Sequence, residues 1–161
     1  MMSSDKYEEF VSEDHAYGVR LPVSILEKMH KDCSAALPKE TGGILVGCYS
    51  EDLNWATITN AYGPSRQSTR YRSSFVRFGF DYLPTLNRLW NKGRYYIGEW
   101  HFHPFSSAAP SSIDVNTMVN LSSDKKLHCP EPVLIVVGGA NGTWDISVSV
   151  FSCGARIVLH K

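Results

Sequence analysis

The sequence has no uncharged apolar run long enough to cross a membrane, and it has no excess of charge of either sign. Its 161 residues carry 16 Lys and Arg against 16 Asp and Glu, so the overall charge gives no reason to expect a nucleic-acid or membrane partner. The polar, acidic start at residues 1–10 does not have the pattern of a secretory signal. We therefore expect a cytoplasmic protein that binds neither a membrane nor nucleic acid.

Cysteine is also scarce, and its placement excludes two common uses. Cys33, Cys48, Cys129 and Cys153 lie far apart and form no C-x-x-C pair, which argues against a disulfide framework and against a cysteine-bound zinc. We expect reduced, partly buried thiols. The sequence lacks a G-x-S-x-G turn, and no cysteine lies in a thiol-protease signature, so catalysis by a serine or cysteine nucleophile is not indicated.

Strands and helices are predicted to alternate along a chain without repeats or linkers, which indicates one α/β domain over residues 1–161. Residues 1–16 are expected to form a flexible N-terminal segment. The apolar spacing predicts helices near 22–38, 80–90 and 112–121, and strands near 17–21, 40–47, 55–59, 94–103, 133–137, 144–151 and 156–160. Such elements are typical of a sheet with helices packed on it.

The most informative stretch runs from His101 to Asp114. Side chains alternate along a strand, so His101 and His103 project from one face while Phe102 points the other way. The next loop leads to Asp114 in the first turn of a helix that Ser111 would cap. Two imidazoles and one carboxylate leave a coordination position open, as in catalytic zinc sites. Paired histidines and S-x-x-D caps each occur without a metal, and only their combination predicts a metal site.

This combination resembles the signature of the JAB/MPN/JAMM zinc metallopeptidases, in which H-x-H-P is followed by S-x-x-D. The resemblance extends to Glu40-Thr-Gly-Gly and to Gly98-Glu-Trp-His101, and it covers the chain from about Tyr17 onward. It implies a single-domain MPN-like fold with a curved, mostly antiparallel sheet flanked by helices. The chain is most similar to stand-alone prokaryotic members, which are encoded beside ubiquitin-activating-like and conjugating-like enzymes, including in antiphage defence operons.

The resemblance also implies a role for each matching residue. His101, His103 and Asp114 would bind Zn²⁺, and Glu40 would take a proton from the attacking water and pass it to the leaving amine. Ser111 would donate a hydrogen bond to the developing oxyanion. The implied reaction is hydrolysis after the C-terminal glycine of a ubiquitin-like protein or its conjugate. Processing of a sulfur-carrier tail and a non-catalytic MPN scaffold are alternatives, although a scaffold would be expected to lack some of these residues.

Two neighbours of the histidines need separate interpretation. Phe102 stands where the family commonly has a small or polar residue, and we expect it to alter packing rather than chemistry. Glu99 lies on the face of the histidines by strand alternation, which makes it a rival base or fourth ligand. We expect Glu99 to lie in solvent or to pair with an arginine, and we favour Glu40 as the base.

Residues 54–79 contain no acidic side chain but include Arg66, Arg70 and Arg72. This segment is interpreted either as a solvated loop or as a docking surface for a protein substrate. Interleaved aromatic residues would also suit single-stranded nucleic acid, which the neutral composition disfavours. We expect the tail of a ubiquitin-like substrate to add a strand to a sheet edge near the catalytic groove.

Overall fold

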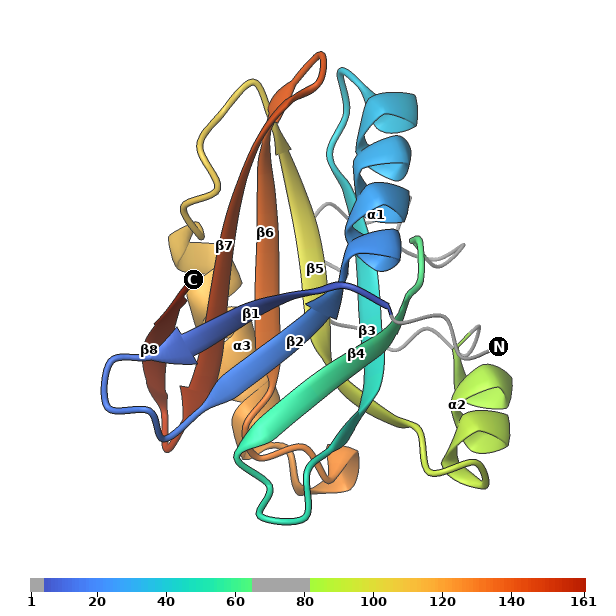
Figure 1. Ribbon diagram of the computed structural model, residues 1–161, viewed down its shortest axis with the longest axis vertical. Helices are drawn as coiled ribbons and strands as arrows, with labels where there is room; N and C mark the ends of the chain where they lie inside the picture. Colours follow the sequence, from blue (N-terminus) through green and yellow to red (C-terminus); the bar gives the residue numbers. More distant parts are fainter. Residues whose placement is uncertain (1–4, 65–81) are drawn as a thin grey trace.

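The computed structural model describes residues 5–64 and 82–161, in which eight strands close into a barrel (Figure 1). The strands are β1 (Tyr7–Ser12), β2 (Gly18–Pro22), β3 (Thr41–Tyr49), β4 (Trp55–Ala61), β5 (Tyr95–Pro104), β6 (Val133–Ala140), β7 (Thr143–Ser152) and β8 (Ala155–His160). The helices are α1 (Val23–Ala36), α2 (Leu83–Trp90) and α3 (Ser112–Ser123). The order around the barrel is β1-β2-β4-β3-β5-β6-β7-β8. These bounds confirm the predicted α/β class.

Closure of the barrel corrects the expectation of an open curved sheet. Residues 7–12, expected to be flexible, instead form β1, which pairs with β2 and closes the barrel through Val11 opposite His160 of β8. Pairing is mostly antiparallel, as predicted, with parallel contacts between β2 and β4 and between β5 and β6. Every described strand has two neighbours in the barrel, and the addition of a substrate strand near the catalytic groove stays a prediction.

Helices α1 and α3 cover different parts of the barrel. Met29 and Cys33 of α1 share the main core with Trp100 and Phe102 of β5. On the other side of β6, α3 is buried against the sheet; this second core comprises Ala108, Met118, Leu121, Leu134, Val136 and Phe151. Because both faces of β6 are covered, its sequence is a continuous apolar run rather than an alternating one.

A bulge in β5 changes which residues share a face. Leu45 of β3 pairs with Gly98, but the next residue of β3, Val46, pairs with Tyr96, so Ile97 is an extra residue in the strand. Gly98 has φ +155°, and a side chain there would collide with the carbonyl of Val133. The bulge places Tyr96 on the same face as Glu99, three residues on, whereas Ile97 joins the main core.

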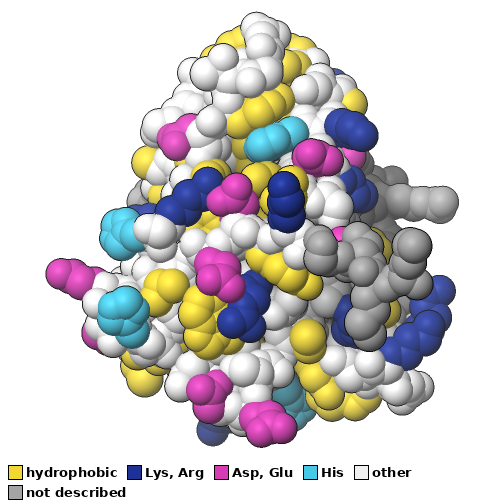
Figure 2. All heavy atoms as spheres, in the orientation of Figure 1, with side chains coloured by type: hydrophobic (Ala, Val, Ile, Leu, Met, Phe, Trp, Pro, Cys, Tyr) yellow, Lys and Arg dark blue, Asp and Glu magenta, His cyan; other side chains and the backbone are white. Residues whose placement is uncertain are grey.

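Charged side chains of both signs occur on the surface in view (Figure 2). Figure 2 shows Lys and Arg interspersed with Asp and Glu, in agreement with the neutral composition. No helix in the described part of the chain is both long and apolar enough to span a bilayer. All four cysteines, each within the described residues, are free thiols, and Cys33 and Cys129 are buried. Arg66, Arg70 and Arg72 lie outside the described residues.

Candidate metal centre

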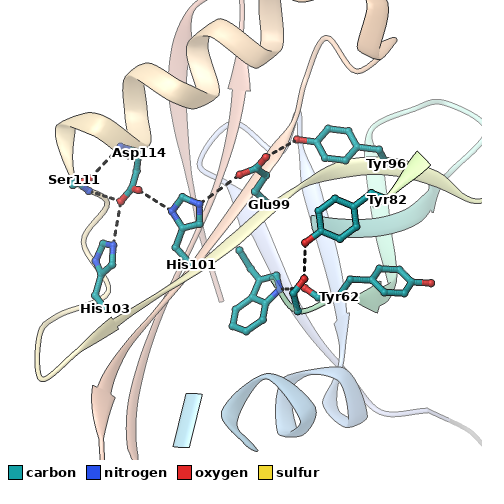
Figure 3. Close-up of polar contacts among 10 residues, drawn as sticks. Tyr62, Tyr82, Tyr96, Glu99, His101, His103, Ser111 and Asp114 are labelled. Atoms are coloured by element: carbon teal, nitrogen blue, oxygen red, sulfur yellow. Dashed lines mark hydrogen bonds and ion pairs between the residues drawn. The ribbon is translucent and has the colours of Figure 1, made fainter. Parts of the chain in front are cut away.

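Strand β5 and the first turn of α3 bring His101, His103 and Asp114 together (Figure 3). His101 Nδ1 lies 2.7 Å from Asp114 Oδ1, and His103 Nε2 lies 3.2 Å from Asp114 Oδ2. One ligand atom from each of the three residues lies within 4.8 Å of the other two. The prediction that both histidines project from one face of a strand is confirmed by these contacts.

The donor set and its surroundings fit a metal ion. Two imidazoles and a carboxylate are the protein ligands found in catalytic zinc sites that keep a further position open. His101 and Asp114 are each only 7% exposed, so the ligands are held by packing rather than left to solvent. The sequence does not show directly that these three residues meet. The path of the loop between β5 and α3 depends on contacts with other elements of the fold. These three residues can therefore hold a metal.

Mutual interaction of the ligands changes their ionisation. Burial opposes ionisation of Asp114, but hydrogen bonds from His101 and His103 outweigh it and hold the pKa of Asp114 well below its usual range. Burial by itself would lower the pKa of His101, but Asp114 and Glu99 raise this pKa to about 9. A metal ion would replace the proton that these carboxylates favour on His101, because a coordinating imidazole nitrogen must be deprotonated.

A capping box fixes Asp114 at the start of α3, as predicted. Ser111 Oγ accepts a hydrogen bond from the Asp114 backbone N–H (3.1 Å), and Asp114 Oδ2 accepts one from the Ser111 backbone N–H (2.8 Å). The two bonds satisfy N–H groups that a helix start otherwise leaves without partners. The first turn of α3 therefore orients the Asp114 carboxylate toward both histidines.

An open pocket of about 490 Å³ lies beside two of the three ligands, His103 and Asp114. Glu40, an exposed residue between α1 and β3, lines it together with Ser111. The other lining residues are His103, Pro104, Ser106, Ile113 and Asp114. The fold thus brings Glu40 to the same pocket as residues more than sixty positions later in the chain, which is the arrangement that a carboxylate base would need.

The loop between His103 and Ser111 is held in place by β7, which sequence analysis missed. The Ala108 N–H donates to Asp145 Oδ2 (2.9 Å), and the Ser147 hydroxyl donates to the Ala108 carbonyl (2.6 Å). A side chain at Gly138 of β6 would collide with the backbone of this loop. Nothing in the sequence near Asp145 and Ser147 indicates this role, because both act across the tertiary structure.

Glu99 lies behind His101, and the expectation that it lies in solvent or pairs with an arginine is wrong. Its side chain is fully buried (0% exposed), with Oε2 3.5 Å from His101 Nε2. The Tyr96 hydroxyl donates to Glu99 Oε1 at 3.4 Å. Burial raises the pKa of Glu99. In Figure 3, Glu99 and Asp114 lie on opposite sides of the His101 ring.

Comparison with known proteins supports the fold and identifies the family. A solution structure of protein DSY2949 from Desulfitobacterium hafniense is similar in fold, with a TM-score of 0.58 and 18% identity over 86% of this chain and 87% of that one. A protein of Enterobacter hormaechei named "CD-NTase/cGAS isopeptidase" is 39% identical over 142 residues, which cover 88% of this chain and 79% of that protein.

A second relative, "Probable metalloprotease y4qB" of Sinorhizobium fredii, is 31% identical over 128 residues, or 77% of each protein. The names of these two relatives support a JAB-type hydrolase. The family described as "Prokaryotic homologs of the JAB domain" matches residues 22–149, which include Glu40 and all three candidate ligands. The chain therefore belongs to the family of prokaryotic JAB-domain homologues, as the resemblance implied.

Proposed function

We propose that this chain is a zinc-dependent isopeptidase that hydrolyses the bond after the C-terminal glycine of a ubiquitin-like protein or of its conjugate. The observation that carries the proposal is the shared pocket: Glu40 and Ser111 line it together with His103 and Asp114. A carboxylate, a hydroxyl and a metal-ligand group in one open pocket are the parts that amide hydrolysis requires.

Each residue has a distinct task in the proposed reaction. His101, His103 and Asp114 would hold zinc, which when bound acts as a Lewis acid and makes water a nucleophile at neutral pH. Glu40 accepts a proton from the water that attacks the glycine carbonyl, and it returns this proton to the amine as the C–N bond breaks. Ser111 Oγ accepts from the Asp114 N–H, which leaves its own hydrogen to donate to the oxyanion.

The relatives and the pocket support the proposed substrate class. A relative 39% identical to this chain is named an isopeptidase of CD-NTase/cGAS, so conjugates of that enzyme class are the first substrates to test. Activating-enzyme-like and conjugating-enzyme-like proteins would then be cytoplasmic partners in an antiphage pathway. Processing of a sulfur-carrier tail would use the same residues on a different substrate. We propose that the ubiquitin-like protein docks on Arg66, Arg70 and Arg72. Residues 54–79 carry no acidic side chain, so no negative charge within this segment offsets these arginines.

Cleavage of defined substrates tests the proposal. A ubiquitin-like protein ending in glycine is fused through its C-terminus to a reporter backbone, and in a second substrate it is linked to a lysine side chain of the reporter. We expect zinc-loaded protein to release the reporter from the lysine-linked substrate and chelator-treated protein to do so only after zinc is restored. Valine in place of the last glycine should block release. Cleavage of the valine substrate would favour a general peptidase. Absence of cleavage of both glycine-ending substrates, the backbone fusion and the lysine-linked one, would favour a scaffold.

A further inference from the structure

We infer that Glu99 is a positioning residue that holds His101 through Nε2, so that Nδ1 is the nitrogen that faces the metal. The inference rests on the proposed metal site and extends it to a residue outside the ligand set. It gives a role to a buried carboxylate that the hydrolytic reaction itself does not use.

The two ring nitrogens of His101 face different carboxylates. Nδ1 lies 2.7 Å from Asp114 Oδ1, whereas Nε2 lies 3.5 Å from Glu99 Oε2. The third ligand, His103, approaches Asp114 through its own Nε2 at 3.2 Å. The Nδ1 edge of the His101 ring is therefore the edge that faces Asp114, the residue that also contacts His103.

Coordination through Nδ1 would leave the only ring hydrogen of His101 on Nε2, directed at Glu99. Metal-binding histidines almost always donate the second ring nitrogen to a carboxylate, a carbonyl or water, which fixes the tautomer and the ring orientation. A separation of 3.5 Å is long for a hydrogen bond, so we expect this contact to shorten when the ring carries its hydrogen on Nε2.

Glu99 is itself held in place from the far side. Its side chain is 0% exposed, and the Tyr96 hydroxyl donates to Oε1, which leaves Oε2 directed at His101. The bulge at Ile97 and Gly98 brings Tyr96 and Glu99 to one face of β5, where regular alternation would separate them. This arrangement forms a continuous row, Tyr96–Glu99–His101–Asp114, visible in Figure 3.

The metal-loaded wild-type protein gives the most direct test. Two-bond ¹H–¹⁵N spectra of uniformly ¹⁵N-labelled, zinc-loaded protein distinguish a histidine bound through Nδ1 from one bound through Nε2. We expect His101 to show a metal-bound Nδ1 and a protonated Nε2. A metal-bound Nε2 on His101 would overturn the inference while leaving the proposed hydrolase intact. Failure of the wild type to bind zinc at all would overturn both.

Zinc affinity of variants tests the positioning role without relying on activity. Glu99→Met should raise the zinc dissociation constant about 10- to 100-fold, measured by competition with a chelator. Glu99→Gln should lose less zinc affinity, because its amide oxygen can still accept from Nε2–H. Glu131→Gln should retain wild-type affinity as a control, because the Glu131 carboxylate contacts Tyr17 and Ser152 rather than a candidate ligand. Wild-type affinity in Glu99→Met, or equal losses in the Met and Gln variants, would contradict the inference. If Glu99→Met does not unfold cooperatively, Glu99→Gln and the wild-type spectra decide.

Discussion

Ser111 and Asp114 hydrogen-bond each other twice across the first turn of α3, with N···O distances of 2.8 and 3.1 Å. The same Asp114 carboxylate contacts His101 through Oδ1 and His103 through Oδ2. The helix cap and the candidate metal centre thus share one side chain. A backbone shift at the start of α3 would therefore move a ligand.

Removal of one candidate ligand should abolish zinc binding. His101→Ala or Asp114→Ala leaves two protein donors where catalytic zinc sites use three, so the purified variants should lose the approximately one zinc per chain expected of the wild type. Elemental analysis measures the loss, and His160→Ala, which changes an exposed histidine, serves as the control. The variants should still unfold cooperatively, because the main core comprises other residues. Stoichiometric zinc in His101→Ala would contradict the ligand assignment.

Loss of the Glu40 carboxylate should stop turnover without loss of zinc. An amide cannot accept the proton of the attacking water, so Glu40→Gln should lower kcat by about 10²- to 10⁴-fold. Glu51→Gln, a change at an exposed glutamate in the turn before β4, should retain full activity. Glu99→Gln should reduce turnover less than Glu40→Gln does. A dead Glu99→Gln enzyme beside an active Glu40→Gln enzyme would reverse the assignment of the base.

Ser111→Ala should reveal two separate effects of one hydroxyl. Loss of the cap should lower the free energy of unfolding by about 1 kcal/mol, measured by urea denaturation. Loss of the oxyanion donor should lower kcat by about 10²- to 10³-fold with little change in KM. Ser112→Ala, one residue inside the helix, should change neither quantity much. A Ser111→Ala enzyme with a normal kcat would remove the oxyanion role and leave only the cap.

Asp145→Ala should loosen the loop that connects His103 to Ser111. The Ala108 N–H would lose its acceptor, at a cost of about 1 kcal/mol in the free energy of unfolding. We also expect weaker zinc binding, because the loop sets the path between two ligands. Asp145→Asn keeps a side-chain oxygen at this position and should be milder in both measurements. Unchanged zinc affinity in Asp145→Ala would show that α3 positions Asp114 without this anchor.

Charge reversal at Arg70 and Arg72 should weaken docking of a ubiquitin-like substrate. The double variant Arg70→Glu, Arg72→Glu should raise KM for the reporter fusion while zinc content and kcat stay near those of the wild type. The paired control is Lys125→Glu, Lys126→Glu, which reverses two exposed charges in the short helical turn after α3. An unaltered KM in the arginine variant would favour the interpretation of a solvated loop.

Local features of the site could be predicted from the sequence because they depend on short-range geometry. Alternation along a strand places His101 and His103 on one face, and the spacing of Ser111 and Asp114 defines a capping box. Helix α2 (Leu83–Trp90) lies within the range 80–90 that the apolar spacing indicated, and Pro84 is in its first turn, where proline is tolerated. The family resemblance added the ligand set and Glu40, and the chain's family is confirmed.

Long-range relationships were decided only by the tertiary structure. No local pattern indicated that β1 would pair with β8 and close the barrel, because such pairing depends on which distant strands become neighbours. The bulge at Ile97 shifts the alternation of β5 and brings Tyr96 beside Glu99, which is buried against Tyr96 and His101 instead of reaching solvent. Alternation could place Glu99 on the face of the histidines but could not state its burial. Periodicity determines the face of an element on which a side chain lies, and the packing of other elements determines what that side chain contacts.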